Sequence, residues 1–254
     1  MEQKFAPWAR SLVQAWSDGA YDHLTQVVFS RADDSIQRLY YYVCELQRRG
    51  LVGGPEPLIL DIAKIPRASS VARTTDCLRL LAERLAVDAP ALVQSVEACN
   101  RERAGLAPVR QARPCLVAGT PPPDRRLHAA IEAAGFTPLS QTLPEAWTAL
   151  GEAVELATGD VFEALARQVR ASAASPRAFV AAGASLEAEI AVSGAEAVIL
   201  WQIEEDESQA WHLPSQRAAL AATGVPALIM TRRDWLARDG ADPEIRAFLQ
   251  GVAQ

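Results

Sequence analysis

The sequence lacks features that several large protein classes require. It contains two lysines, Lys4 and Lys64, its basic residues form no run, and its formal net charge is −6. This scattered charge argues against a nucleic-acid surface. No apolar run approaches the length of a membrane span, and the N-terminus has neither the charge pattern nor the cleavage site of a signal peptide. We therefore expect a cytoplasmic protein without nucleic-acid or membrane partners.

Cysteine is also sparse, and its spacing excludes the common zinc and redox patterns. The four cysteines lie far apart and form no CxxC pair. They are Cys44, Cys77, Cys99 and Cys115. The three histidines show no spacing typical of a metal site, and no serine lies in a GxSxG turn. We expect the cysteines to be small buried hydrophobic residues in a reducing cytoplasm, and we expect no bound metal.

What the sequence does contain is an alternation of short β-rich runs with longer helical patterns. Its 254 residues, half of them apolar, suffice for one large domain or two modest ones. Continuous apolar runs indicate parallel strands buried on both faces. The predicted fold is α/β, with two Rossmann-like lobes whose parallel sheets are flanked by helices. The segment GLAPVRQARP separates an N-terminal lobe, residues 1–108, from a C-terminal lobe, residues 109–254.

The same patterns predict the individual elements. Strands are expected at residues 26–30, 57–62, 115–119, 136–141, 196–202 and 226–231. Helices are expected at residues 4–17, 34–49, 69–85, 89–103, 125–134, 177–193, 208–223 and 243–252, with a less defined helical stretch at 145–175. The first helix should pack Phe5, Trp8, Leu12 and Trp16 on one side, and Pro214 should interrupt the helix at 208–223.

Ligands of open parallel sheets bind beyond the carboxyl ends of strands, so the turns that follow strands are candidate sites. The first such turn, SRADDS, offers Ser30, Arg31 and Asp33 to a ligand, and the amides of the following helix to an anion. The alternative is that Asp33 and Asp34 only cap that helix and favour its dipole.

The second turn, GTPPPDRR, offers Gly119 and Thr120, and its two arginines could bind phosphate through their side chains. Three consecutive prolines remove backbone donors, so the turn is neither a Walker loop nor a GxGxxG fingerprint. The alternative interpretation is a rigid turn capped by Asp124.

Two further turns carry charge. IEEDES could bind a divalent cation, because carboxylates are ligands for hard ions, or it could be a solvated loop. TRRDW could turn Arg232 and Arg233 toward an anionic ligand, or expose them on a connecting loop. Together the strand ends give six candidates for a ligand crevice: Ser30, Arg31, Asp33, Gly119, Thr120 and Trp201.

The order of the segments resembles one known family. VVFSRADDSIQRLYYYVCEL is similar to the region after the first strand in subunits of the 2-hydroxyacyl-CoA dehydratase and benzoyl-CoA reductase family, such as the D component of 2-hydroxyglutaryl-CoA dehydratase. Further segments resemble later parts of that family: PLILDIAKIPR, SVEACNRER, CLVAGTPPP, IEAAGFTPL, GAEAVILW, ATGVPALIM and PEIRAFLQGV. The resemblance spans most of the chain.

This resemblance implies a cofactor that the chain has no ligands for. Family subunits hold a [4Fe-4S] cluster through three cysteines, since soft thiolates bind iron in such clusters. The first ligand would fall at Asp33, the second near Pro144, and the third further along, but residues 116–254 contain no cysteine. Family members also carry an additional segment before the first strand. We therefore expect a shortened relative that retains the scaffold, binds no cluster of its own and takes acyl-CoA as ligand.

Three hypotheses of function follow. The first is a dehydratase-like accessory or acyl-CoA-binding subunit that associates with a second subunit of the family or with itself. The second is an active dehydratase or reductase component whose cluster is supplied by a larger partner. The third is a protein–protein interaction module that uses the hydrophobic face around Tyr40–Tyr42 and the helix of Trp8 and Trp16. Whether the chain is an enzyme stays open.

Overall fold

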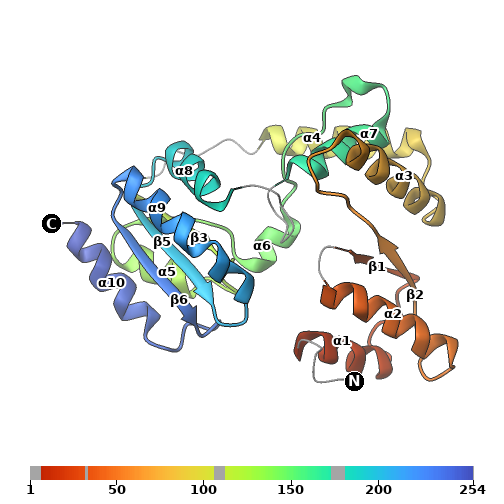
Figure 1. The fold of residues 1–254 in the computed structure, drawn as a ribbon, viewed down its shortest axis with the longest axis horizontal. Coiled ribbons are helices and arrows are strands. Elements are labelled where there is room, and N and C mark those ends of the chain that lie inside the picture. Colours follow the sequence, from red (N-terminus) through yellow and green to blue (C-terminus); the bar gives the residue numbers. More distant parts are fainter. Residues whose placement is uncertain (1–6, 32–33, 106–111, 173–180, 254) are drawn as a thin grey trace. The chain divides into compact units, whose positions relative to one another are not determined.

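The computed structural model describes residues 7–31, 34–105, 112–172 and 181–253 (Figure 1). The chain forms two compact units. The first contains Met1–Leu106 and Gly151–Phe179, and the second contains Ala107–Leu150 and Val180–Gln254. The chain therefore leaves the first unit, begins the second, and returns once to the first.

The first unit has a parallel sheet of two strands. Its elements are α1 (Pro7–Ser17), β1 (Gln26–Ser30), α2 (Asp34–Arg48), β2 (Glu56–Leu60), α3 (Ala68–Arg84), α4 (Ala89–Gly105), the 3-10 turn η1 (Leu156–Thr158) and α7 (Val161–Ala171). One core joins α1, β1 and α2 and contains Trp16, Phe29 and Leu39. A second core joins α4 and α7 around Val96 and Val161.

The returning segment of the first unit is held by specific contacts. The side chain of Asn100 on α4 donates to the carbonyl of Val154 at 2.9 Å and accepts from its amide at 3.0 Å. The ammonium group of Lys64 donates to the carbonyls of Val169 and Ser172 at the end of α7. These contacts explain why the segment after residue 150 packs with the first unit.

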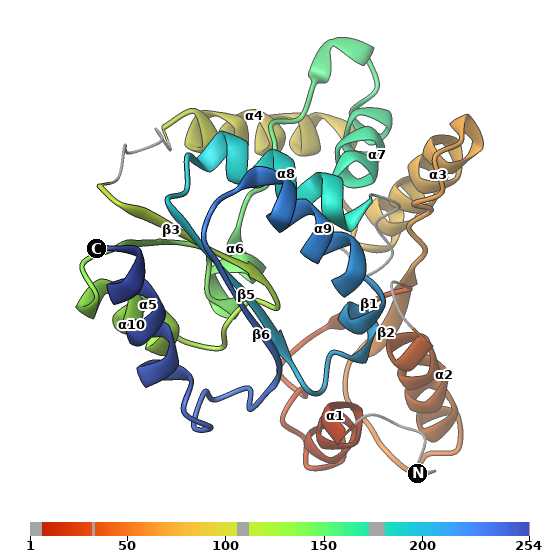
Figure 2. The same ribbon diagram turned by 60° about the vertical axis from the view of Figure 1, so that its left-hand side comes forward.

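The second unit has a parallel sheet of four strands in the order β4-β3-β5-β6, of which Figure 2 labels β3, β5 and β6. Its elements are β3 (Pro114–Gly119), α5 (Arg126–Ala133), β4 (Thr137–Leu139), α6 (Leu143–Thr148), α8 (Ala182–Ser193), β5 (Ala197–Ile203), the 3-10 turn η2 (Glu207–Trp211), α9 (Leu213–Thr223), β6 (Ala227–Arg233) and α10 (Ala241–Val252).

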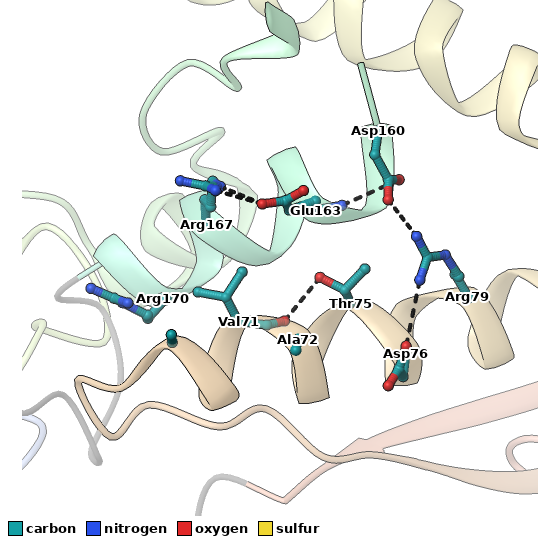
Figure 3. Close-up of a pocket in the computed structure, with 10 residues that line it drawn as sticks. Val71, Ala72, Thr75, Asp76, Arg79, Asp160, Glu163, Arg167 and Arg170 are labelled. Atoms are coloured by element: carbon teal, nitrogen blue, oxygen red, sulfur yellow. Dashed lines mark hydrogen bonds and ion pairs between the residues drawn. The ribbon is translucent and has the colours of Figure 1, made fainter. Parts of the chain in front are cut away.

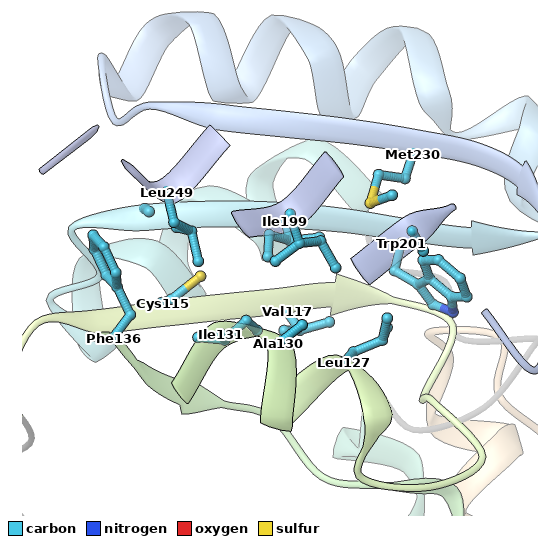
Figure 4. Close-up of a cluster of buried hydrophobic side chains, with 13 residues drawn as sticks. Cys115, Val117, Leu127, Ala130, Ile131, Phe136, Ile199, Trp201, Met230 and Leu249 are labelled. Atoms are coloured by element: carbon cyan, nitrogen blue, oxygen red, sulfur yellow. The ribbon is translucent and has the colours of Figure 1, made fainter. Parts of the chain in front are cut away.

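Alternating side chains of β3 and β5 fill cores on both faces of this sheet. Cys115 and Val117 pack with Ile199 under α5 and α10 (Figure 4). Leu116 and Val198 point to the other face and pack under α8 and α9. The continuous apolar runs thus reflect burial on both faces, and the predicted α/β class with parallel sheets flanked by helices is confirmed.

The predicted elements agree with the structure to within a few residues, with one informative difference. In α1 the buried stripe runs through Ala9, Val13 and Trp16, whereas Trp8 and Leu12, which we predicted to pack beside Trp16, are 44% and 37% exposed. As predicted, Pro214 interrupts the helix at 208–223, which begins as η2 and restarts as α9, because proline fits the first turn of a helix and not its interior. The helix predicted at 177–193 corresponds to α8 from Ala182 onward, and residues 177–180 lie outside the described residues.

None of the helices in the described part of the chain combines the length and the apolar character that crossing a bilayer requires.

Candidate functional site

The second unit has a topological switch point between β3 and β5. The chain leaves β3 through α5 toward β4 on one side, whereas α9 carries it from β5 to β6 on the other side. Ligands of open α/β sheets bind at the carboxyl ends of the two strands that flank such a point. Gly119 ends β3 and lies opposite Trp201 of β5, so three predicted crevice residues, including Thr120, meet here.

Gly119 is required by the close approach of the two strands. Its φ is +101°, and a Cβ at this position would lie 2.1 Å from the carbonyl oxygen of Trp201. The amide of Thr120 donates to that same oxygen at 2.8 Å. A side chain at position 119 would therefore separate β3 from β5 at the switch point.

Thr120 links the turn after β3 to the acidic turn after β5. Its hydroxyl donates to Oδ2 of Asp206 at 3.3 Å, and the hydroxyl of Ser208 donates to Oδ1 of the same carboxylate at 2.7 Å. Glu204 of the acidic turn pairs with Arg232 of the fourth predicted turn at 2.7 Å. The structure thus brings three of the four predicted turns together at one edge of one sheet.

Trp201 contributes its backbone to this edge, while its side chain belongs to the core. The indole is fully buried and lies at the carboxyl end of β5 (Figure 4). Its Nε1 has no hydrogen-bond partner within the described ranges. The neighbouring Gln202 is also buried, and its amide donates to the side-chain oxygen of Gln216 at 3.0 Å.

The arginines of the turn after β3 are held by neighbouring groups. Arg125 pairs with Glu132 at 2.8 Å, and Arg126 donates to the carbonyl of Leu236 at 2.7 Å. Oδ1 of Asp124 accepts from the amide of Arg126 at 3.0 Å, at the start of α5. The turn is therefore fixed by its own side chains, and its prolines leave few amides for a ligand.

The candidates of the first unit lie at the end of β1. Ser30 is opposite Leu60 of β2, and the amide of Arg31 donates to the carbonyl of Leu60 at 2.9 Å. The guanidinium of Arg31 lies 3.4 Å from Oδ2 of Asp61, which also lies 3.6 Å from Arg73. Asp33 lies outside the described residues.

Among the residues that the structure describes, no group of three or more histidines, cysteines and acids could hold a metal ion. The four cysteines are free, and three of them are partly buried. Cys115 is fully buried, and this burial raises the pKa of its thiol to about 12. Cys115 is therefore the buried hydrophobic side chain that we predicted, whereas Cys44, Cys77 and Cys99 are only partly buried.

The position near Pro144, where the family resemblance would place a second cluster ligand, starts a helix. The amide and hydroxyl of Thr142 donate to Oε2 of Glu145 at 2.7 Å and 2.8 Å, which forms the capping box of α6. These hydrogen bonds from Thr142 lower the pKa of Glu145. Local helix capping accounts for the residues at this position.

A charged groove lies between α3 and α7 in the first unit, and no sequence pattern indicated it (Figure 3). Its volume is about 500 Å³. Its lining residues are Ala68, Val71, Ala72, Thr75, Asp76, Arg79, Asp160, Glu163, Arg167 and Arg170. The available signal was the spacing of acids and arginines in α7, but pairing this helix with α3 requires the tertiary fold.

Comparison with known proteins adds no family to these observations. No protein-family model matches the chain, and no curated protein matches it.

Proposed function

We propose that this protein is a dehydratase-like subunit that binds an acyl-CoA thioester and holds no iron–sulfur cluster of its own. The switch point of the second unit is the main support, because Gly119 and Thr120 meet β5 where open α/β sheets bind their ligands. The segment resemblance described above suggests the thioester as the ligand class.

The chemistry of the switch point restricts how such a ligand binds. Because the prolines after Thr120 lack amide donors, a phosphate would not be held there by a backbone loop. The polar groups at hand are the Thr120 hydroxyl and the carboxylate of Asp206. These groups suit the hydrogen-bonding parts of a thioester or a pantetheine arm, which are amides, carbonyls and hydroxyls.

Titration calorimetry with acetyl-CoA and benzoyl-CoA tests the binding, and iron and sulfide analysis of protein purified without oxygen tests the absence of a cluster. We expect saturable heat with at least one thioester and no stoichiometric iron. Absence of heat with both probes contradicts the proposed thioester binding. A stoichiometric bound cluster contradicts the proposal that the chain holds no iron–sulfur cluster of its own.

A pair of threonine variants makes the location testable. Thr120→Val removes the hydroxyl at the switch point, and we expect thioester binding to weaken about tenfold through the loss of one hydrogen bond. Thr148→Val is the control, because the Thr148 hydroxyl donates to the carbonyls of Pro144 and Glu145 within α6, away from the switch point. Equal affinities of the two variants would place the thioester elsewhere.

A second candidate, a subunit-binding role, is favoured by the apolar surface of α1 and its surroundings. Trp8, Leu12 and Leu24 are exposed there, and Tyr41 of α2 is 58% exposed. A single such residue is ordinary, but several on neighbouring segments are typical of an interface. Sedimentation analysis over a concentration range tests this role: self-association that Trp8→Ser weakens supports it, and a monomer at all concentrations contradicts self-association.

A further inference from the structure

The groove between α3 and α7 has an uneven distribution of charge. Its three carboxylates and three guanidinium groups balance in number, but they do not balance in pairs. Figure 3 shows Arg79 with two acids at one end, Arg167 with its own acid in the middle, and Arg170 at the other end. The pairing of each group decides which of them a ligand can use.

Arg79 and Asp160 are fully engaged by the fold. Oδ2 of Asp160 forms an ion pair with Arg79, while Oδ1 accepts from the amides of Phe162 and Glu163 and caps α7. Arg79 also lies 3.4 Å from Asp76, and its guanidinium carbon is 5.8 Å from the ring centre of Phe162. This end of the groove is therefore a fixed wall.

The other two arginines are available to a ligand. Arg167 has one acid, Glu163, which lies one turn earlier on the same helix, with Nε to Oε1 at 3.0 Å. Such exposed pairs within a helix are weak and exchange readily with other anions. Arg170 has no ion pair with any residue in the described ranges. The spacing of Arg167 and Arg170 places both on one face of α7.

The wall opposite these arginines is apolar. Ala68, Val71 and Ala72 of α3 line it, and the hydroxyl of Thr75 is taken up by the carbonyl of Val71 at 2.9 Å. The volume of about 500 Å³ lies within the range of pockets that hold small organic molecules and exceeds what one inorganic anion fills. The groove thus combines an anion-binding side with an apolar side.

From this combination we infer that the groove binds a small organic phosphate, with the phosphate on Arg170 and Arg167 and the organic part against α3. Guanidinium groups bind phosphate in a bidentate manner, and a phosphate monoester has enough oxygen atoms for two of them. This inference does not rest on the proposed function, because the groove belongs to the first unit and its variants leave Thr120 unchanged.

Calorimetric titrations of the full chain with AMP, inorganic phosphate and adenosine test the inference. AMP should bind more tightly than inorganic phosphate, because it also uses the apolar wall, and adenosine should not bind. Affinity for AMP should fall as the salt concentration rises, since ion pairs are screened. Equal affinity for AMP and adenosine, or no binding of AMP, would overturn the inference.

Two charge-matched variants locate the binding. Arg170→Gln should weaken AMP binding about tenfold or more through the loss of charge-assisted hydrogen bonds. It leaves no described carboxylate without a partner, so the fold should be kept. Arg101→Gln on α4 removes the same charge from the same unit outside the groove and should bind AMP like the original chain. Equal weakening by both variants would show an unspecific charge effect and reject the site.

Discussion

The two units bury their parallel sheets to different depths. Six of the seven residues of β5 are buried, whereas β1 has one buried residue in five. The second unit covers both faces of four strands with helices, while the first has two strands. A two-stranded sheet depends on the helices that pack against it, because it has little stability alone. The difference indicates that the second unit provides the rigid frame for its switch point.

The largest expected effect is a difference in thiol reactivity between the two units. Three cysteines lie in the first unit, and Cys115 lies in the second. Burial raises the pKa of Cys115 from 9.0 to about 12, which lowers its thiolate fraction about a thousandfold. We expect alkylation of the native protein to modify Cys44, Cys77 and Cys99 well before Cys115. Peptide mass spectrometry over time measures the order, and equal rates at all four sites would contradict the comparison.

Replacing Gly119 should destabilise the second unit. Gly119→Ala places a Cβ against the Trp201 carbonyl at a positive φ, and we expect a loss of about 3 kcal/mol in unfolding free energy. Gly224→Ala is the control, because Gly224 also has a positive φ, +67°, but open space around it. It should lose about 1 kcal/mol. Urea unfolding measures the two free-energy losses. Equal losses would show that the close approach of β3 and β5 is not the reason why position 119 requires glycine.

The same truncation in a strand of each unit compares the two sheets directly. Val198→Ala in β5 removes two fully buried methyl groups and should cost about 2 kcal/mol. Val28→Ala in β1 affects a side chain that is 42% exposed and should cost less than about 1 kcal/mol. Both losses are read from urea unfolding. A larger loss of unfolding free energy for Val28→Ala than for Val198→Ala would contradict the conclusion that the sheet of the second unit is the more deeply buried one.

The smallest effects come from exposed carboxylates, where the two units should behave alike. Hydrogen bonds from Arg48 and then Arg49 lower the pKa of Glu45 to about 2, and those from Arg238 lower the pKa of Asp234 to about 2. A lowered pKa means that each group stabilises the folded state above its ordinary pKa. This contribution is lost as the pH falls from about 4 through about 2.

Carboxyl NMR titration measures these two pKa values. Arg238→Gln should raise the pKa of Asp234 toward 3.8 and leave that of Glu45 near 2. If Asp234 of the unaltered chain titrates near 3.8, the ion pair with Arg238 does not hold in solution.

Much of the fold follows from local patterns. The run around Ile199 predicts β5 because a short apolar run rich in β-branched residues favours a strand buried on both faces, and Gly119 marks the end of β3. The return of the chain to the first unit could not be read in this way. Asn100 and Lys64 hold that segment by donating hydrogen bonds to backbone carbonyls. Every residue has a backbone carbonyl, so such contacts leave no recognisable pattern in the sequence.

The candidate site was predictable in part for a similar reason. The rule that ligands bind at strand ends led to Gly119 and Thr120, and both lie at the switch point. The link from Thr120 to Asp206 was not predictable, since it depends on which strands become neighbours. The α3–α7 groove was also not predictable from the sequence. Arg170 becomes part of a binding groove because the apolar side of α3 packs beside it, and these two helices are distant in sequence.

Hydrogen exchange of the full chain, with and without acetyl-CoA, tests most directly whether the four-stranded sheet carries the ligand site. Without ligand, amides of β3 and β5 should exchange more slowly than those of β1 and β2. Adding the thioester should slow exchange further in the turns at residues 120–125 and 203–208. Unchanged exchange in both turns at a saturating thioester concentration would contradict the account.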